Sequence, residues 1–215
     1  MQVTWKMHAR YLLRDTWIWQ RLMGMREKRQ ARTWVKAGRF GPPHVVKQQM
    51  IRDFAERFHA TTLIETGTFL GDMVYAMKDQ FKSIYSIELS QELYDRARKS
   101  FEKYPHIHLI AGDSATELKN VLANIQGRCL FWLDGHYSGG ITALGKERCP
   151  IRGEIQAILQ FADEKPVILV DDAICFDGSH GYPTLFELHD VVTSRLAGYQ
   201  MTILDNVIQI FPQIA

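Results

Sequence analysis

The sequence is poor in cysteine and lacks any long apolar run, and each absence excludes classes of protein. Its 215 residues hold three cysteines (Cys129, Cys149 and Cys175) and no C-x-x-C pair, which argues against a disulfide framework and a cysteine-bound zinc site. No apolar run approaches the roughly 20 residues that span a bilayer. The first 25 residues have neither a continuous apolar segment nor a small-residue cleavage site, so a secretory signal is not expected. Together these absences predict a cytoplasmic protein.

What is present divides the chain by charge. Residues 1–39 hold ten Lys or Arg against two Asp or Glu, whereas residues 40–215 hold sixteen against twenty-two. The first stretch also contains four of the five tryptophans: Trp5, Trp17, Trp19 and Trp34. Gly41-Pro42-Pro43 punctuates its end. We therefore predict a basic, Trp-rich helical arm over residues 1–43 and a globular domain over residues 44–215.

Strand-like and helix-like segments alternate along the predicted domain. Apolar residues every four positions predict a helix at 46–58, with further helices at 71–81, 91–103, 115–125, 154–161 and 184–196. Short apolar runs predict strands at 61–65, 83–88, 106–111, 129–133, 166–170, 201–204 and 207–211. This alternation predicts an α/β fold with a mostly parallel seven-stranded sheet, helices on both faces and a C-terminal antiparallel hairpin turning at Asp205-Asn206.

Acidic residues follow five successive predicted strands at the point where each strand ends. They are Glu65, Glu88, Asp113, Asp134 and the pair Asp171-Asp172. Because sheets of this kind bind ligands at the carboxyl ends of their strands, we expect these acids to line the site.

The first turn of the domain, Glu65 to Gly71, has G-x-x-x-G spacing rather than the G-x-G-x-x-G of dinucleotide sites. Glu65 would repel a pyrophosphate, which disfavours an NAD-type oxidoreductase, and would attract a cationic ligand. Glu88, 21 residues after Gly67, suits the two hydroxyls of a ribose, and Asp113 suits an adenine amino group. S-adenosylmethionine (SAM) joins adenosine to a cationic amino-acid tail and satisfies all three.

With these motifs in this order, residues 44–215 resemble class I SAM-dependent methyltransferases, which have a Rossmann-like fold. The resemblance implies a methyltransferase with SAM as cofactor. Phe69 stands where the commoner pattern has a further glycine, and we expect Phe69 and Leu70 to pack beneath the loop. The implied cofactor-binding residues are Glu65, Thr66, Gly67, Thr68, Gly71, Asp72, Glu88, Leu89, Gly112, Asp113, Ser114, Asp134 and Gly135.

The ends of the fourth and fifth strands leave three interpretations of the catalytic residues open. In the first, Asp134, Asp171 and Asp172 hold Mg²⁺, which lowers the pKa of a substrate hydroxyl. Catechol-type and macrolide-sugar O-methyltransferases, which the chain resembles here, place acids at the same two strand ends. In the second, His136 is the general base and no metal is needed, with His180 as a further base candidate. In the third, Asp171 or Asp172 caps the next segment and His136 only packs in its loop.

The acceptor is suggested by a second resemblance. W-L-D-G-H-Y-S-G-G at residues 132–140 resembles a bacterial methyltransferase group associated with surface-polysaccharide or glycan pathways, which implies O-methylation of a sugar or glycan intermediate. The Gly-rich segment 135–153 is expected to be a lid whose Lys146, Arg148 and Arg152 hold an acceptor phosphate or carboxylate, or else a solvated charged loop. A non-catalytic adenosyl-binding protein of the same fold is the alternative function.

The basic arm has two main interpretations. Its aromatic residues pack on the globular domain or on a second subunit of a homodimer, or the arm lies on an anionic membrane, peripheral at the inner membrane surface. No recognised nucleic-acid motif is present, so no nucleic-acid partner is expected.

Overall fold

The computed structural model describes residues 13–38, 41–135 and 149–213. Helices and strands alternate from residue 44 onward, as predicted. The helices are α2 (Trp17–Lys36), α3 (His44–Phe58), α4 (Asp72–Met77), α5 (Gln91–Phe101), α6 (Ser114–Leu122), α7 (Ile151–Leu159) and α8 (Leu185–Arg195), with 3-10 turns η1 (Ala162–Glu164) and η2 (Ala173–Cys175). The strands are β1 (Thr62–Thr66), β2 (Ser83–Glu88), β3 (Ile107–Ala111), β4 (Cys129–Leu133), β5 (Val167–Val170), β6 (Tyr199–Leu204) and β7 (Val207–Pro212).

The seven strands form one sheet in the order β3-β2-β1-β4-β5-β7-β6. Six strands run in one direction and β7 runs against them, pairing antiparallel with both β5 and β6. Asp205 and Asn206 both have positive φ, which is the backbone of the tight hairpin turn between β6 and β7. The predicted sheet and its closing hairpin are therefore confirmed.

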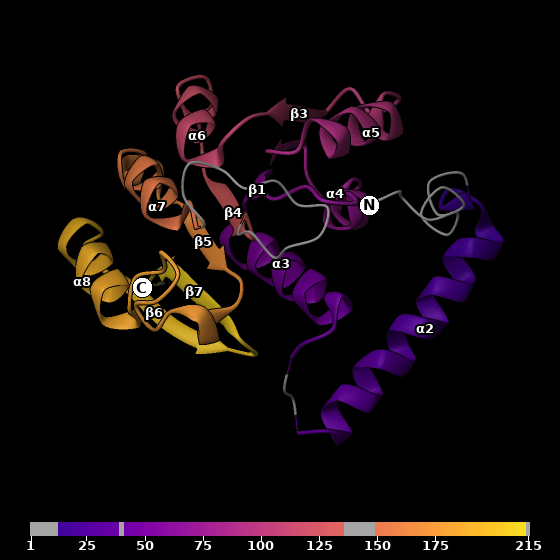
Figure 1. The fold of residues 1–215 in the computed structure, drawn as a ribbon, viewed down its shortest axis with the longest axis horizontal. Coiled ribbons are helices and arrows are strands. Elements are labelled where there is room, and N and C mark those ends of the chain that lie inside the picture. Colours follow the sequence, from indigo (N-terminus) through magenta and orange to yellow (C-terminus); the bar gives the residue numbers. More distant parts are fainter. Residues whose placement is uncertain (1–12, 39–40, 136–148, 214–215) are drawn as a thin grey trace.

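Helices cover both faces of the sheet, because successive strand residues point to opposite sides. On one face, Ile64 and Phe131 pack in a core with apolar residues of α6, α7 and α8. On the other, Leu63 and Leu130 pack with residues of α3, α4 and α5. Figure 1 shows this layered arrangement, with the helix α2 set apart from the sheet beyond α3. The two cores hold the helices against the sheet, and the parallel pairing of β1 to β5 places the carboxyl ends of these strands at one edge.

The helix α2 contacts the domain near its start, where Gln20 donates to the Tyr75 hydroxyl at 3.3 Å. Near its start, the Arg14 guanidinium stacks on the rings of Tyr75 and Phe101, at 4.7 and 4.5 Å from their centroids. Near its end, Trp34 is buried. Among the described residues, no helix has the length and apolarity required to cross a membrane.

Two predicted helix bounds are wrong for identifiable reasons. The helix α7 begins at Ile151 rather than 154, directly after Pro150, so the predicted irregular segment ends earlier. Gly153 disfavours a helix locally, but an added Cβ there would lie 2.7 Å from the Ala115 Cβ, so a glycine permits the close packing of α7 on α6. The helix α4 ends at Met77 rather than 81, because the chain turns there and buries Phe81.

Candidate active site

The parallel register brings the acidic strand ends to one edge of the sheet. Thr66 is paired with both Ile87 and Leu133, and Leu133 with Val170, so β1, β2, β4 and β5 end side by side. Strand β3 follows beside β2, and the predicted acids lie within the last two residues of these five strands or the two residues after them: Glu65, Glu88, Asp113, Asp134, Asp171 and Asp172. The edge therefore has the acidic character that we expected from the sequence.

Glu65 is connected to the first turn through Ser86 and Thr68. Its side chain is buried, and its carboxylate accepts a hydrogen bond from Ser86, whose hydroxyl lies 2.6 Å from that of Thr68. Burial raises the pKa of Glu65 well above its usual value, and the nearby Asp134 and Glu88 raise it further. Glu65 thus contacts the strand β2 rather than the open face of the loop.

Gly67 allows the turn to pass close to the end of β4. Its φ is +83°, and an added Cβ would lie 2.5 Å from the backbone carbonyl oxygen of Asp134. The amide of Gly67 donates to the Ile87 carbonyl at 2.9 Å, and the amide of Asp134 donates to the Thr66 carbonyl at 3.2 Å. Glycine is required at position 67 both by the backbone angle and by the space.

The expectation that Phe69 packs beneath the loop is wrong. Phe69 adopts a left-handed backbone with φ of +48°, and its side chain is 43% exposed, while Leu70 is half-buried. Thr68 takes the inward position instead and is 3% exposed. The Phe69 side chain is therefore exposed at the carboxyl edge of the sheet.

Both carboxylate oxygens of Glu88 accept hydrogen bonds from backbone amides. One carboxylate oxygen accepts from the amide of Phe69 and the other from the amide of Ser90, each at 2.8 Å. Burial raises the pKa of Glu88, while these amides favour the ionised form. Because a carboxylate oxygen can accept more than one hydrogen bond, both oxygens keep capacity for a pair of hydroxyls. Leu89, the next residue, is exposed.

Asp113 caps the helix α6, accepting from the amide of Ala115 at 3.0 Å, and Gly112 before it has a φ of +148°. Ser114, the first residue of α6, donates to the Glu154 carboxylate at 2.5 Å. These residues fix the end of β3 beside the helix α7. At the end of β1, Gly71 and Asp72 form the N-terminus of α4.

Glu154 was missed by the sequence analysis. It is 1% exposed, and burial raises its pKa to about 7 despite the hydrogen bond from Ser114. An added Cβ at Gly135 would lie 3.2 Å from the Glu154 carboxylate, so this acid reaches the end of β4. Its position was detectable, because Glu154 falls three residues after Ile151 and one before Ile155, on the buried face of α7.

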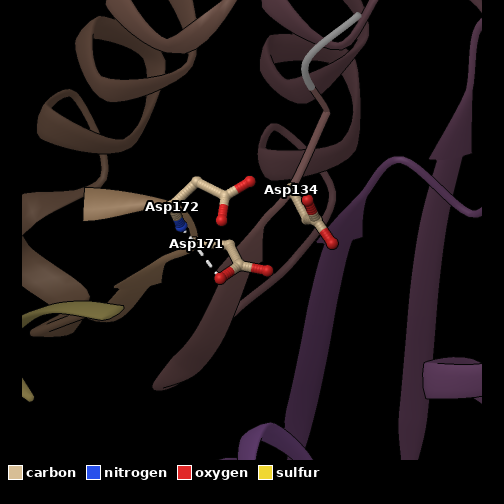
Figure 2. Close-up of side chains that lie close together, drawn as sticks. All are labelled: Asp134, Asp171 and Asp172. Carbon is tan, nitrogen blue, oxygen red and sulfur yellow. Dashed lines mark hydrogen bonds between the residues drawn. The ribbon is translucent and has the colours of Figure 1, made fainter. Parts of the chain in front are cut away.

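Three carboxylates meet where β4 and β5 end. Oxygens of Asp134, Asp171 and Asp172 lie within 4.8 Å of one another, and among the described residues they form the group whose spacing suits a metal ion (Figure 2). Asp171 accepts from the amide of Asp172 at 2.8 Å. Oxygen ligands at this spacing fit a hard divalent cation such as Mg²⁺. Burial raises the pKa of Asp134 and Asp171, and Asp171 raises that of Asp134 further.

Lys47 of α3 already supplies a positive charge to this cluster. Its ammonium forms an ion pair with Asp171, whose side chain is 1% exposed, and partly offsets the rise that burial causes in the pKa of that carboxyl. On the other side, the Asn206 amide of the hairpin turn donates to Asp172 at 3.1 Å. Lys47 and Asn206 come from opposite ends of the domain sequence, so neither was apparent as a neighbour of the acids.

The base candidates have different outcomes. His136 lies outside the described residues, as do Lys146 and Arg148. His180 is exposed in the loop after η2 and has a left-handed backbone, whereas Tyr182 from the same loop lines the pocket formed by Asp134, Asp171 and Glu154. Arg152 forms an ion pair with Glu187 of α8 at 3.2 Å. To bind the acceptor as predicted, Arg152 would have to leave or share its ion pair with Glu187.

Comparisons with solved structures identify the fold. An O-methyltransferase from Bacillus cereus in complex with S-adenosylhomocysteine (SAH) is 11% identical, with a TM-score of 0.59 over 87% of this chain and 90% of that chain. TomG from Streptomyces achromogenes, involved in tomaymycin synthesis and solved with SAM, is 12% identical, with a TM-score of 0.57 over 87% and 89%. SAH-bound PaMTH1 from Podospora anserina is 17% identical, with a TM-score of 0.54 over 88% and 87%.

The chain therefore has the Rossmann-like fold of these methyltransferases, as predicted. No family model matches the sequence. No curated protein matches it either.

Proposed function

We propose that this protein is a SAM-dependent O-methyltransferase. The observation that carries the proposal is the first turn, Glu65 to Gly71, braced by Glu88 through the Phe69 amide at the carboxyl edge of a methyltransferase fold. The acids along this edge suit the cationic sulfonium and ammonium of SAM. They do not suit the pyrophosphate of NAD, which needs unopposed amides at a helix N-terminus.

Residues at three strand ends would each bind a different part of SAM. Glu88 would accept hydrogen bonds from the ribose hydroxyls, and Asp113 with Ser114 would lie near the adenine. The turn around Gly67, supported from below by Glu65, would surround the methionine part. Bound SAM supplies an electrophilic methyl group, so the protein has to align an acceptor oxygen and remove its proton.

We propose the cluster of Asp134, Asp171 and Asp172 as the place where the acceptor hydroxyl is activated. Its spacing fits Mg²⁺, which when bound lowers the pKa of a coordinated hydroxyl. The alternative is His136 acting as the base without metal. Activity that survives exhaustive chelation would favour His136, whereas activity lost on chelation and restored by Mg²⁺ would support the cluster.

The acceptor is proposed as a sugar or glycan-pathway hydroxyl. The support is the resemblance of residues 132–140 to glycan-associated methyltransferases and the exposed edge beside the acid cluster. A panel of sugar nucleotides and small glycans, incubated with SAM labelled on its methyl group, would identify an acceptor by transfer of the label. Labelling of small phenolic or catechol acceptors alone would overturn the sugar assignment.

Calorimetry with SAM, SAH and NAD tests the cofactor. We expect SAM and SAH to bind and NAD not to. If folded protein bound NAD in preference, the methyltransferase proposal would fail. Binding of SAM without SAH production in the presence of any acceptor in the panel would instead point to a non-catalytic adenosyl-binding protein.

A further inference from the structure

One face of the helix α2 points toward the domain, and we call it the inward face. Met23, Glu27 and Gln30 follow one another along this face and line a groove of about 400 Å³ with His44 and Gln48 of α3. Trp34, one turn further along the same face, is buried. The position of the inward face beside α3 explains the residues found there. The residues of the opposite, outward face need a separate explanation.

The outward face of α2 is both apolar and basic. Ile18, Leu22, Met25, Arg29, Arg32 and Lys36 are spaced alternately four and three residues apart, so they form a single stripe along the helix. Trp17, Arg21, Lys28 and Val35 lie beside this stripe. The five apolar side chains on this face are each 50% to 70% exposed: Trp17, Ile18, Leu22, Met25 and Val35.

The charge on this face has one sign. Five exposed Lys or Arg side chains belong to it: Arg21, Lys28, Arg29, Arg32 and Lys36. The single acid in the sequence of α2 is Glu27, which lies on the inward face. Twenty residues of helix extend for about 30 Å, so the cations form a continuous strip rather than a point.

We propose that the outward face of α2 is a docking surface for an anionic lipid membrane, on which the helix lies parallel to the surface. Basic side chains would contact the lipid headgroups, and Ile18, Leu22 and Met25 would enter the boundary between headgroups and acyl chains. Lys and Arg stems can extend past such apolar residues and keep their charges at the headgroups.

Two other occupants explain the face less well. A nucleic acid would account for the cations but not for a row of exposed aliphatic side chains. A second copy docking by the same face would gather the five cations of each copy in one interface, and this face of α2 carries no acid to pair with them. An anionic lipid surface complements both the charge and the apolar side chains.

Sedimentation of the full chain with lipid vesicles tests the proposal. We expect binding to phosphatidylcholine vesicles that contain phosphatidylserine, weaker binding when salt is raised, and little binding to phosphatidylcholine alone. The triple variant Arg21→Gln, Arg29→Gln, Arg32→Gln should bind about 100-fold more weakly, since each basic residue near an anionic surface strengthens binding roughly fivefold. The matched control Lys82→Gln, Lys99→Gln, Lys119→Gln removes three exposed charges elsewhere and should bind almost as the wild type does.

The apolar part of the surface has its own test. Leu22→Gln with Met25→Gln should also reduce vesicle binding, whereas Val191→Gln with Ile203→Gln, exposed on the domain, should not. The proposal would be overturned if wild type ignored anionic vesicles, or if both control variants lost as much binding as the α2 variants. Tighter binding of single-stranded RNA than of vesicles at the same salt, or a dimer that the α2 variants dissociate, would also overturn it.

Discussion

At the scale of single residues, the Glu88 carboxylate is oriented by the protein's own backbone. Its two oxygens are oriented by the amides of Phe69 and Ser90, so a ribose would meet a carboxylate already in place. We expect Glu88→Ala to weaken SAM binding by about 1–3 kcal/mol in calorimetry, because charge-assisted hydrogen bonds are lost. Glu102→Ala, an exposed acid, is the control. An unchanged affinity in Glu88→Ala would remove this residue from the ribose.

Glu154 gives the protein a pH dependence with a definite sign. Between the ordinary pKa of 4.5 and the folded value of about 7, the unfolded chain releases this proton while the folded chain retains it. Stability is therefore lost as the pH rises through this range, by up to about 3 kcal/mol for a shift of this size.

The variant Glu154→Gln would isolate this effect, because an amide keeps an acceptor for Ser114 but does not ionise. Relative to wild type, its free energy of unfolding should be higher by less than about 1 kcal/mol at pH 5 and by about 3 kcal/mol at pH 8. Urea unfolding at both pH values measures the difference between the two proteins. Asp113 and Asp134, which interact with Glu154, are present in both proteins, so most of their own effect on the pH dependence of stability cancels in the comparison. An equal difference at the two pH values would contradict the prediction.

Lys47 should oppose metal binding, because its ammonium is paired with one of the three acids a divalent ion would use. We predict that Lys47→Met binds Mn²⁺ about tenfold or more tightly, since one nearby positive charge is removed from a partly buried cluster. The same variant should be less stable without metal, because it leaves Asp171 buried and unpaired. Lys78→Met, which removes the partner of exposed Asp79, is the control. Equal Mn²⁺ affinity for Lys47→Met and wild type would show that Lys47 does not compete.

At the scale of elements, two helical glycines provide a matched pair. An added Cβ at Gly153 in α7 would meet the Ala115 Cβ at 2.7 Å, whereas one at Gly24 in α2 would meet nothing within 4 Å. We expect Gly153→Ala to destabilise the protein by about 1–3 kcal/mol through overpacking. Gly24→Ala should stabilise it by up to about 1 kcal/mol through helix propensity. Thermal unfolding of both variants measures the two effects, and changes of the same sign would be inconsistent with this packing.

The elements themselves could largely be predicted from periodicity. The strands β1, β2, β4, β5 and β7 follow short apolar runs because both faces of the sheet are buried there, whereas the edge strands β3 and β6 are more exposed. Element ends were less predictable. Gly153 disfavours a helix locally, yet it lies inside α7, where the close approach of Ala115 from α6 leaves room only for glycine. A contact between such distant residues leaves no local pattern in the sequence.

At the scale of the whole molecule, the sheet and its two cores are built from residues between Met50 and Phe211. We therefore expect the fragment 44–215 to fold and to bind SAM with nearly the affinity of the full chain. It should be less stable by about 1–3 kcal/mol, because Arg14 no longer stacks on Tyr75 and Phe101. Circular dichroism and calorimetry of the fragment test this division. An unfolded fragment would show that the arm is part of the domain.

The sequence alone determined the sheet, the order of the acidic strand ends and the division of charge, because apolar periodicity and turn residues are local features of the chain. Tertiary structure decided what those acids contact. Lys47 forms an ion pair with Asp171, which is 124 residues away in the sequence. Glu65 accepts a hydrogen bond from Ser86, 21 residues away, and Glu154 accepts one from Ser114, 40 residues away. Such contacts depend on how helices pack on the sheet, and packing joins residues whose separation along the chain carries no signal.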